Sequence, residues 1–192
     1  MVKKYVFNRK IENTILLIHG LHTTSGYWLS NLPIFKNFKI IAFDINYDKL
    51  LLTEFNSKDI FKKEFCVDEK VVGIISHSFG TVISDLSFEY NNDIMFKICP
   101  VAFSRKNDPI NFIKDVRNRT CLSEDMIKNI NKNANTFSLR ARDFIKSSGQ
   151  FYIPKTDCYF TYNIPKSYKI EFIGDHFNIK NALILINEKL NS

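Results

Sequence analysis

Short apolar runs alternate along the chain with longer stretches that have the periodicity of helices. Nearly continuous apolar runs are typical of strands that are covered on both faces, as in parallel sheets. We expect central strands at 14–18, 39–43, 71–75, 95–103, 158–162 and 169–173, with an edge strand at 2–7. Helices are expected at 79–90 and at 179–190, the latter with Asn178 as its N-cap. This alternation predicts an α/β architecture with parallel strands.

The segment 109–149 contains no run that is typical of a strand. Three pieces of it have helical character: "INFIKDVRN", "SEDMIKNINK", which opens with a Ser-Glu-Asp start signal, and "TFSLRARDFIKSSG", which ends before a glycine. We interpret 109–149 as a small helical cap inserted over the sheet. Residues 1–192 are therefore predicted to form a single domain, without internal repeats or a low-complexity linker.

The length and composition fit this picture. A chain of 192 residues with 45% hydrophobic and 24% charged residues can bury a sizeable core. The first apolar run is interrupted by polar residues at 8–10 and 12–13, and no apolar run reaches the length that a membrane span requires. We therefore expect a cytoplasmic, monomeric protein that has no membrane partner.

The net charge of +7 raises the question of an anionic partner, such as nucleic acid, a membrane surface or an acidic carrier protein. The basic residues are scattered, no run of five or more like charges occurs, and no nucleic-acid-binding motif is present. A lysine-rich composition explains the charge, and no nucleic-acid partner is expected. The four cysteines form no CxxC or Cys/His metal spacing, so we expect reduced thiols and no metal or organic cofactor.

Candidate chemistry begins at "IISHSFGTV" (74–82), where an expected strand meets an expected helix. Ser78 stands at the turn, with Ser76 and Gly80 two positions away on either side. A tight strand-to-helix turn projects such a serine outward and requires small residues at both flanking positions. The motif thus matches G-x-S-x-G except at Ser76. His77, inside the motif, is expected to line the pocket or to contact a neighbouring strand.

Two further motifs also follow expected strands. In "ILLIHGLHTTSGYW", a buried run ends at His19-Gly20, and the glycine permits a sharp turn and a close backbone approach. In "KIEFIGDHFNIKNALILINEKL", a late run ends at Gly174-Asp175-His176. The carboxyl ends of parallel strands meet at one edge of a sheet, where the active sites of open α/β proteins form. We therefore expect the three motifs to lie together.

These three motifs, in this order, resemble those of the α/β-hydrolase superfamily, in which serine or alanine at the position of Ser76 is a familiar departure. The resemblance implies an α/β-hydrolase fold with Ser78 as the nucleophile and His176 as the general base. It also implies an oxyanion hole made by the backbone N–H groups of Leu21 and Phe79. His19 would then be a structural loop residue, while Trp28 and His22 would border the substrate.

The acid that would orient His176 stays open between two aspartates. In most of the superfamily it follows the strand after the helical insertion, and a strand at 151–153 would place Asp157 there. The run 158–162 is the longer one, however, and as the strand it would leave Asn163 at the catalytic edge instead. Asp108, in the loop after the preceding strand, is the alternative that we place narrowly first, although it equally suits an N-cap before Pro109. Asp175 is expected to point away from the base.

The chemistry implied is hydrolysis of a carboxylic ester or thioester through an acyl-serine intermediate. The short, basic, cytoplasmic chain also resembles the pimeloyl-acyl-carrier-protein methyl ester esterases of biotin synthesis. That resemblance implies a substrate carried on an acidic acyl-carrier protein. The alternatives are a general short-chain esterase or thioesterase, and a catalytically silent hydrolase-fold binding module.

Overall fold

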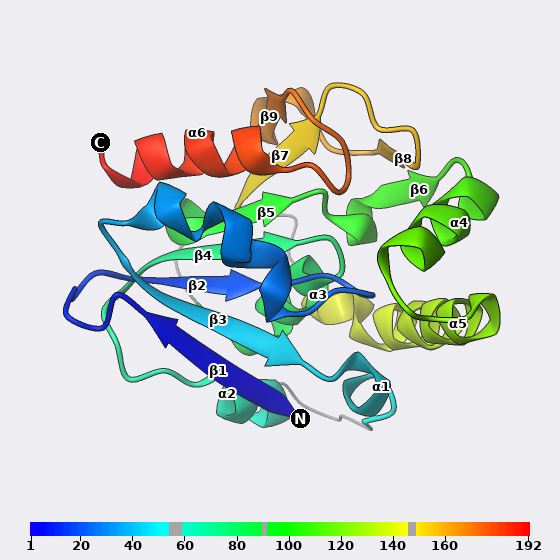
Figure 1. Cartoon of the computed structure of the whole chain (residues 1–192), viewed down its shortest axis with the longest axis horizontal. Helices are drawn as coiled ribbons and strands as arrows, with labels where there is room; N and C mark the ends of the chain where they lie inside the picture. Colours follow the sequence, from blue (N-terminus) through cyan, green and yellow to red (C-terminus); the bar gives the residue numbers. More distant parts are fainter. Residues whose placement is uncertain (54–58, 90–91, 146–148) are drawn as a thin grey trace.

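The computed structural model describes residues 1–53, 59–89, 92–145 and 149–192 (Figure 1). Its described residues form a seven-stranded sheet in the order β1-β3-β2-β4-β5-β7-β9. Strand β1 is antiparallel to β3, and every other pair in this sheet is parallel. The strands are β1 (Val2–Phe7), β2 (Thr14–Ile18), β3 (Lys39–Ile45), β4 (Val71–His77), β5 (Met95–Ile98), β7 (Gln150–Pro154) and β9 (Lys169–Phe172). The expected α/β class with a mainly parallel sheet is confirmed.

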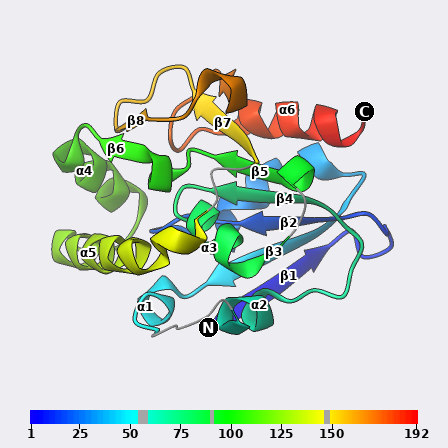
Figure 2. The ribbon, with the colours of Figure 1, turned by 180° about the vertical axis from the view of Figure 1, so that it is seen from behind.

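Helices cover both faces of this sheet (Figures 1 and 2). On one face, α6 (Lys180–Leu190) and the 3₁₀ segment η1 (Ser25–Phe35) pack on a core cluster that includes Ile15 and Leu17. On the other face, α2 (Asp59–Phe65) and α3 (Gly80–Ser87) pack on a cluster that includes Leu16 and Ile18. Alternate residues of β2 therefore point to opposite faces of the sheet. Because both faces are covered, the sequence of β2 is apolar along most of its length.

A helical layer lies beyond the carboxyl ends of the parallel strands (Figure 1). It consists of α4 (Pro109–Arg119) and α5 (Glu124–Ala141). Beside it, β6 (Ser104–Lys106) and β8 (Phe160–Tyr162) form a small antiparallel sheet. The remaining short elements are α1 (Tyr47–Leu50) and the 3₁₀ turns η2 (Asn92–Ile94), η3 (Val101–Phe103), η4 (Arg142–Phe144) and η5 (Lys166–Tyr168). No helix among the described residues is both long and apolar enough to cross a membrane.

Three expectations about elements are wrong. The run 95–103 is not one strand, because β5 ends at Ile98 and a 3₁₀ turn separates it from β6. The run 158–162 does not supply a central strand, because β8 pairs with β6 and its side chains pack toward the helical layer. The shorter run supplies the central strand β7, which is buried on both faces. Asn178 does not cap α6, because its backbone closes a turn with Asp175.

A buried ion pair joins β5 to α3 beneath the strand ends. The ammonium of Lys97 lies 2.8 Å from the carboxylate of Asp85, and both side chains are at most 1% exposed. Buried charges are tolerated only when they are paired, so this contact fixes α3 against the sheet. Because α3 begins two residues after Ser78, the ion pair also supports the turn that carries Ser78.

Candidate active site

Ser78 occupies the turn between β4 and α3 with a φ of 54°, in the left-handed region that non-glycine residues seldom adopt. Its N–H donates to the carbonyl of Ile98 at 2.9 Å, and its carbonyl accepts from the hydroxyl of Thr81 at 2.7 Å. The neighbouring strand and the first turn of α3 therefore hold the strained residue in place.

Two glycines bring the loop after β2 against this turn. A Cβ atom on Gly80 would lie 2.6 Å from the carbonyl oxygens of both Ile18 and His19, and one on Gly20 would lie 2.8 Å from Ser78 Cβ. Both positions thus require glycine. Ser76, which stands in the other glycine position of the motif, is buried, and its hydroxyl accepts from Ser84 Oγ at 3.2 Å. The extra hydroxymethyl group is therefore accommodated.

The close approach places two backbone donors beside Ser78. Leu21 and Phe79 line the same cavity as Ser78. Neither of their N–H groups donates a hydrogen bond to another described residue. Two such donors converging near a nucleophile can stabilise an oxyanion.

His176 lies in the loop after β9, and its Nε2 is 3.1 Å from Ser78 Oγ. The ring is 1% exposed and packs against Phe160, with the ring centroids 4.5 Å apart. His77 holds the backbone of the same residue, because its Nε2–H donates to the carbonyl of His176 at 2.8 Å. Asp175 points away from the ring, since its Oδ1 accepts from the N–H groups of Phe177 and Asn178.

The carboxylate on the far side of His176 is that of Asp157. Its Oδ2 lies 3.7 Å from His176 Nδ1, which is too far for a hydrogen bond. The hydroxyl of Tyr162 lies between them, 2.7 Å from Asp157 Oδ2 and 3.2 Å from His176 Nδ1. Tyr162 therefore connects the acid to the imidazole.

This chain of contacts fixes the direction of each hydrogen bond. An ionised carboxylate only accepts, so Tyr162 donates its single hydroxyl proton to Asp157. The tyrosine oxygen must then accept from Nδ1–H of His176. In a neutral imidazole the other nitrogen, Nε2, then carries a lone pair, and it can accept the proton of Ser78.

Burial and neighbouring groups shift the pKa values of this site. Burial would raise the pKa of Asp157, but His176 and Tyr162 favour the ionised form, and the pKa falls below its usual value. Burial, together with the nearby His176, lowers the pKa of His77 to about 3, so His77 is neutral. Burial raises the pKa of Tyr162, whose hydroxyl keeps its proton.

Two residues expected at the site lie elsewhere. Asp108 is the N-cap of α4, and its carboxylate accepts from the backbone N–H of Asn111 at 2.9 Å and from its side chain. The carboxylate that is connected to His176 is Asp157 instead, because the central strand before it is β7. Trp28 is 1% exposed within the core and is not among the described residues that line the cavity, because η1 turns it toward the sheet.

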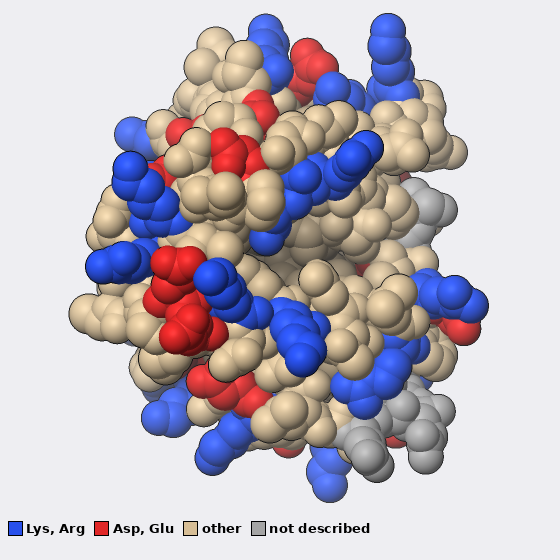
Figure 3. All heavy atoms as spheres, turned by 90° about the vertical axis from the view of Figure 1, so that its right-hand side faces the viewer, with Lys and Arg blue, Asp and Glu red and all other residues tan. Residues whose placement is uncertain are grey.

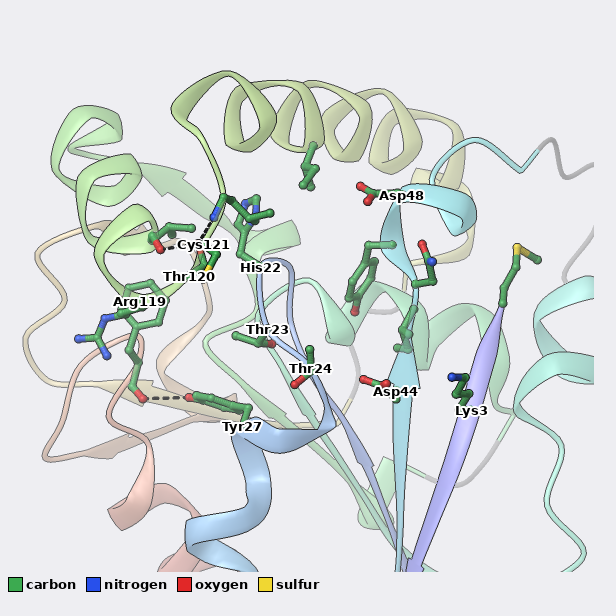
Figure 4. A pocket seen from close by; sticks show the side chains of 18 residues that line it. Lys3, His22, Thr23, Thr24, Tyr27, Asp44, Asp48, Arg119, Thr120 and Cys121 are labelled. Carbon is green, nitrogen blue, oxygen red and sulfur yellow. Dashed lines mark hydrogen bonds between the residues drawn. The ribbon is translucent and has the colours of Figure 1, made fainter.

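The cavity that contains Ser78 and His176 has a volume of about 560 Å³. A second cavity of about 940 Å³ adjoins it and shares His22, Thr23 and Phe177 with it. Figure 4 shows Thr23 and Thr24 near the centre of the second cavity, with Arg119 on one side and Lys3 on the other. His22 lines both cavities, with a φ of 61° and its Nε2 3.1 Å from Asn131 Oδ1 on α5.

Sequence reasoning missed two residues. Tyr162 contacts both Asp157 and His176, and Lys106 lines the cavity that contains Ser78. Neither stands in a recognisable motif, so no sequence signal singled them out. His77, Cys99 and His176 present potential metal-ligand atoms within 4.8 Å of one another. Nε2 of His77 and both ring nitrogens of His176 already have hydrogen-bond partners in the arrangement described above.

Comparison of the whole structure with solved structures identifies the architecture. The NocB thioesterase domain, in a covalent complex with a fluorophosphonate nocardicin G analogue, superposes with a TM-score of 0.63 at 11% identity, covering 99% of this chain and 100% of that chain. The chain has the α/β-hydrolase fold. The thioesterase domain from the curacin biosynthetic pathway superposes with a TM-score of 0.61 at 10% identity, covering 100% of this chain and 95% of that chain.

An α/β-hydrolase fold protein from Burkholderia ambifaria superposes with a TM-score of 0.60 at 13% identity, covering 97% of this chain and 92% of that chain. Neither a family model nor a curated protein matches the chain by sequence. At identities this low, the structural similarity establishes the fold and leaves the chemistry to be argued from the site.

Proposed function

We propose that this protein is a serine hydrolase that cleaves esters or thioesters through an acyl-enzyme intermediate. The observation that carries the proposal is the chain of contacts from Ser78 through His176 and Tyr162 to Asp157. It starts at a strained serine beside two backbone N–H groups that have no partner among the described residues.

In the proposed mechanism, Ser78 Oγ attacks the substrate carbonyl carbon while its proton passes to Nε2 of His176. The N–H groups of Leu21 and Phe79 receive the negative charge that develops on the carbonyl oxygen. Tyr162 and Asp157 stabilise the imidazolium on its Nδ1 side. His176 then gives the proton to the departing alcohol or thiol, and water, activated by the same imidazole, releases the acid.

The substrate class is inferred from the fold neighbours and from charge. Two of the superposed structures are described as thioesterase domains, one of them from the curacin biosynthetic pathway. Figure 3 shows several Lys and Arg side chains around a hollow on the face that carries the helical layer. We propose an acyl substrate carried on an acidic carrier protein, with the methyl ester of pimeloyl-acyl-carrier protein as the specific candidate.

This candidate is tested by comparing the pimeloyl-carrier methyl ester with simple short-chain esters. We expect faster hydrolysis of the carrier-bound ester and a loss of that advantage at high salt, because salt screens docking between basic and acidic surfaces. Hydrolysis of short-chain esters alone would instead indicate a general esterase.

Labelling with a fluorophosphonate probe tests the chemistry itself. We expect covalent labelling of the wild-type protein at Ser78, none in Ser78→Ala, and strongly slowed labelling in His176→Ala. Circular dichroism of each variant checks that it is folded. A folded wild-type protein that shows no Ser78-dependent labelling would contradict the proposal and favour a silent binding module.

A further inference from the structure

Lys106 lies close to the base without belonging to the hydrogen-bonded chain. It ends β6 and pairs in register with Phe160 of β8. Its ammonium lies 4.3 Å from the ring centroid of Phe112 and 5.9 Å from that of Phe160. Both rings pack against His176, at centroid distances of 6.1 and 4.5 Å. The cation is therefore one aromatic ring away from the base, in the wall of the catalytic cavity.

The charge of Lys106 has no anionic counterpart among the described residues. The carboxylates of the surrounding elements have other partners: Asp108, two residues along the chain, accepts from Asn111, Asp115 of α4 accepts from the hydroxyl of Tyr159, and Asp157 accepts from Tyr162. The lysine is also half-buried, and this burial lowers its pKa. A partly desolvated cation gains more from an anion than an exposed lysine does.

We propose that Lys106 forms an anion subsite in the catalytic cavity, for a carboxylate or phosphate that the substrate carries besides its scissile ester or thioester. This inference rests on the proposed hydrolase function and narrows its substrate class. The aromatic rings hold the ammonium by cation–π contact and limit its hydration. An anion that enters the cavity would form an ion pair with the ammonium of Lys106, which has no ion-pair partner among the described residues.

The anion has two possible sources, the acyl chain and the leaving group, and paired substrates distinguish them. Monomethyl glutarate is compared with methyl hexanoate, a neutral ester of similar chain length. Butyryl-4′-phosphopantetheine is compared with butyryl-pantetheine, which lacks the phosphate. For at least one pair, we expect kcat/KM to favour the anionic member by about tenfold, as for a hydrogen bond to a charged group.

Replacing the ammonium by a methyl thioether of similar length, in Lys106→Met, is expected to abolish that preference within the same pair. Lys106→Arg keeps the charge and should keep most of the preference, which separates loss of charge from loss of folding. Lys114→Met is the matched control, since Lys114 is exposed on α4 and is not among the residues lining the cavity. It should keep the wild-type preference.

Binding to Ser78→Ala, measured by calorimetry with the same four compounds, separates this inference from the hydrolase proposal. Tighter binding of an anionic member, lost on adding Lys106→Met, supports the subsite even if no ester is turned over. Equal binding of both members of each pair overturns it, as does a preference that survives Lys106→Met. Absence of turnover with every ester counts against the hydrolase function alone.

Discussion

The two sides of His176 are built in different ways. Ser78 belongs to a contiguous unit, β4, turn and α3, that is packed into the main core and held to β5 by a backbone hydrogen bond. Asp157 and Tyr162 belong to a loop and a three-residue strand outside the central sheet. Ser78 is thus positioned by a unit of the main core. The carboxylate of Asp157 accepts from the N–H groups of Tyr159 and Phe160, and this segment is itself held by the pairing of β8 with β6 and by the aromatic cluster around Phe160. Substitutions that weaken the packing beneath Ser78 should therefore reduce stability, whereas substitutions of Asp157 or Tyr162 should reduce the rate.

The largest expected effect is on the acid side. Asp157→Asn removes the charge opposite the imidazolium and should lower kcat by about 10²- to 10⁴-fold, in the range of triad acids. Its matched control is Asp108→Asn, which changes the α4 cap and should leave the rate of ester hydrolysis near wild type. Initial rates with a short-chain ester measure both. A rate lowered equally by the two substitutions would contradict the assignment of Asp157.

On the nucleophile side, Lys97→Met leaves the buried carboxylate of Asp85 without its cationic partner. We expect the free energy of unfolding to fall by about 3–5 kcal/mol. The double variant Asp85→Leu/Lys97→Met should recover most of that loss.

Urea denaturation measures these changes, with Lys128→Met as the control. Lys128 pairs with Glu124 on the exposed face of α5, so its loss should cost less than about 1 kcal/mol. A small effect of Lys97→Met would show that α3 does not depend on this ion pair.

A smaller effect is expected for the connecting hydroxyl. Tyr162→Phe should lower kcat by about tenfold, because the hydrogen bonds to Asp157 and His176 are lost, and should change KM little. Tyr159→Phe is the matched control, because that hydroxyl bonds Asp115 and has no contact with the base. If Tyr162→Phe retains the wild-type kcat, Asp157 must act on His176 directly.

At neutral pH the smallest effect concerns His77, which joins the two sides by holding the His176 carbonyl. Its pKa is about 3 in the folded protein and 6.5 as a free group, so below pH 6.5 the unfolded chain binds a proton that the folded chain does not. As the pH is lowered below 6.5, the free energy of unfolding should therefore decrease, by up to about 1.4 kcal/mol per pH unit from this group.

His77→Gln keeps a donor for the His176 carbonyl and removes this titration. The slope of unfolding free energy against pH, measured by denaturant titration between pH 6.5 and 4, should become shallower. His19, whose pKa burial also lowers, should sustain the rest of the slope. An unchanged slope would contradict the buried neutral state of His77.

The contrast between the main core and the small β6–β8 sheet also explains which strands could be predicted from the sequence. Strand β2 was predicted with its observed bounds, because a strand buried on both faces is apolar throughout. The run 158–162 is also apolar, but Phe160 packs against His176 and Phe112 instead of the main core. Composition cannot distinguish a strand of the central sheet from a strand of the small β6–β8 sheet, so the sequence does not identify the strand before Asp157 and favours Asp108.

Ser78, His176, Leu21 and Phe79 line one cavity, because each follows a strand end that a local motif marks. Tyr162 and Lys106 follow no such motif. Their positions depend on the pairing of β6 with β8, which links residues more than fifty positions apart. Long-range pairing of two three-residue strands leaves little trace in the sequence.

The contact between Gly20 and Ser78 has a consequence for how the two backbone donors behave over time. Leu21 and Phe79 sit on different loops, yet Gly20 and Gly80 leave no space between those loops. The donors should therefore fluctuate together, and the proposed oxyanion hole should be preorganised before substrate arrives, with little reorganisation needed as charge develops. A methyl group on either glycine would separate the donors while leaving every catalytic side chain in the sequence.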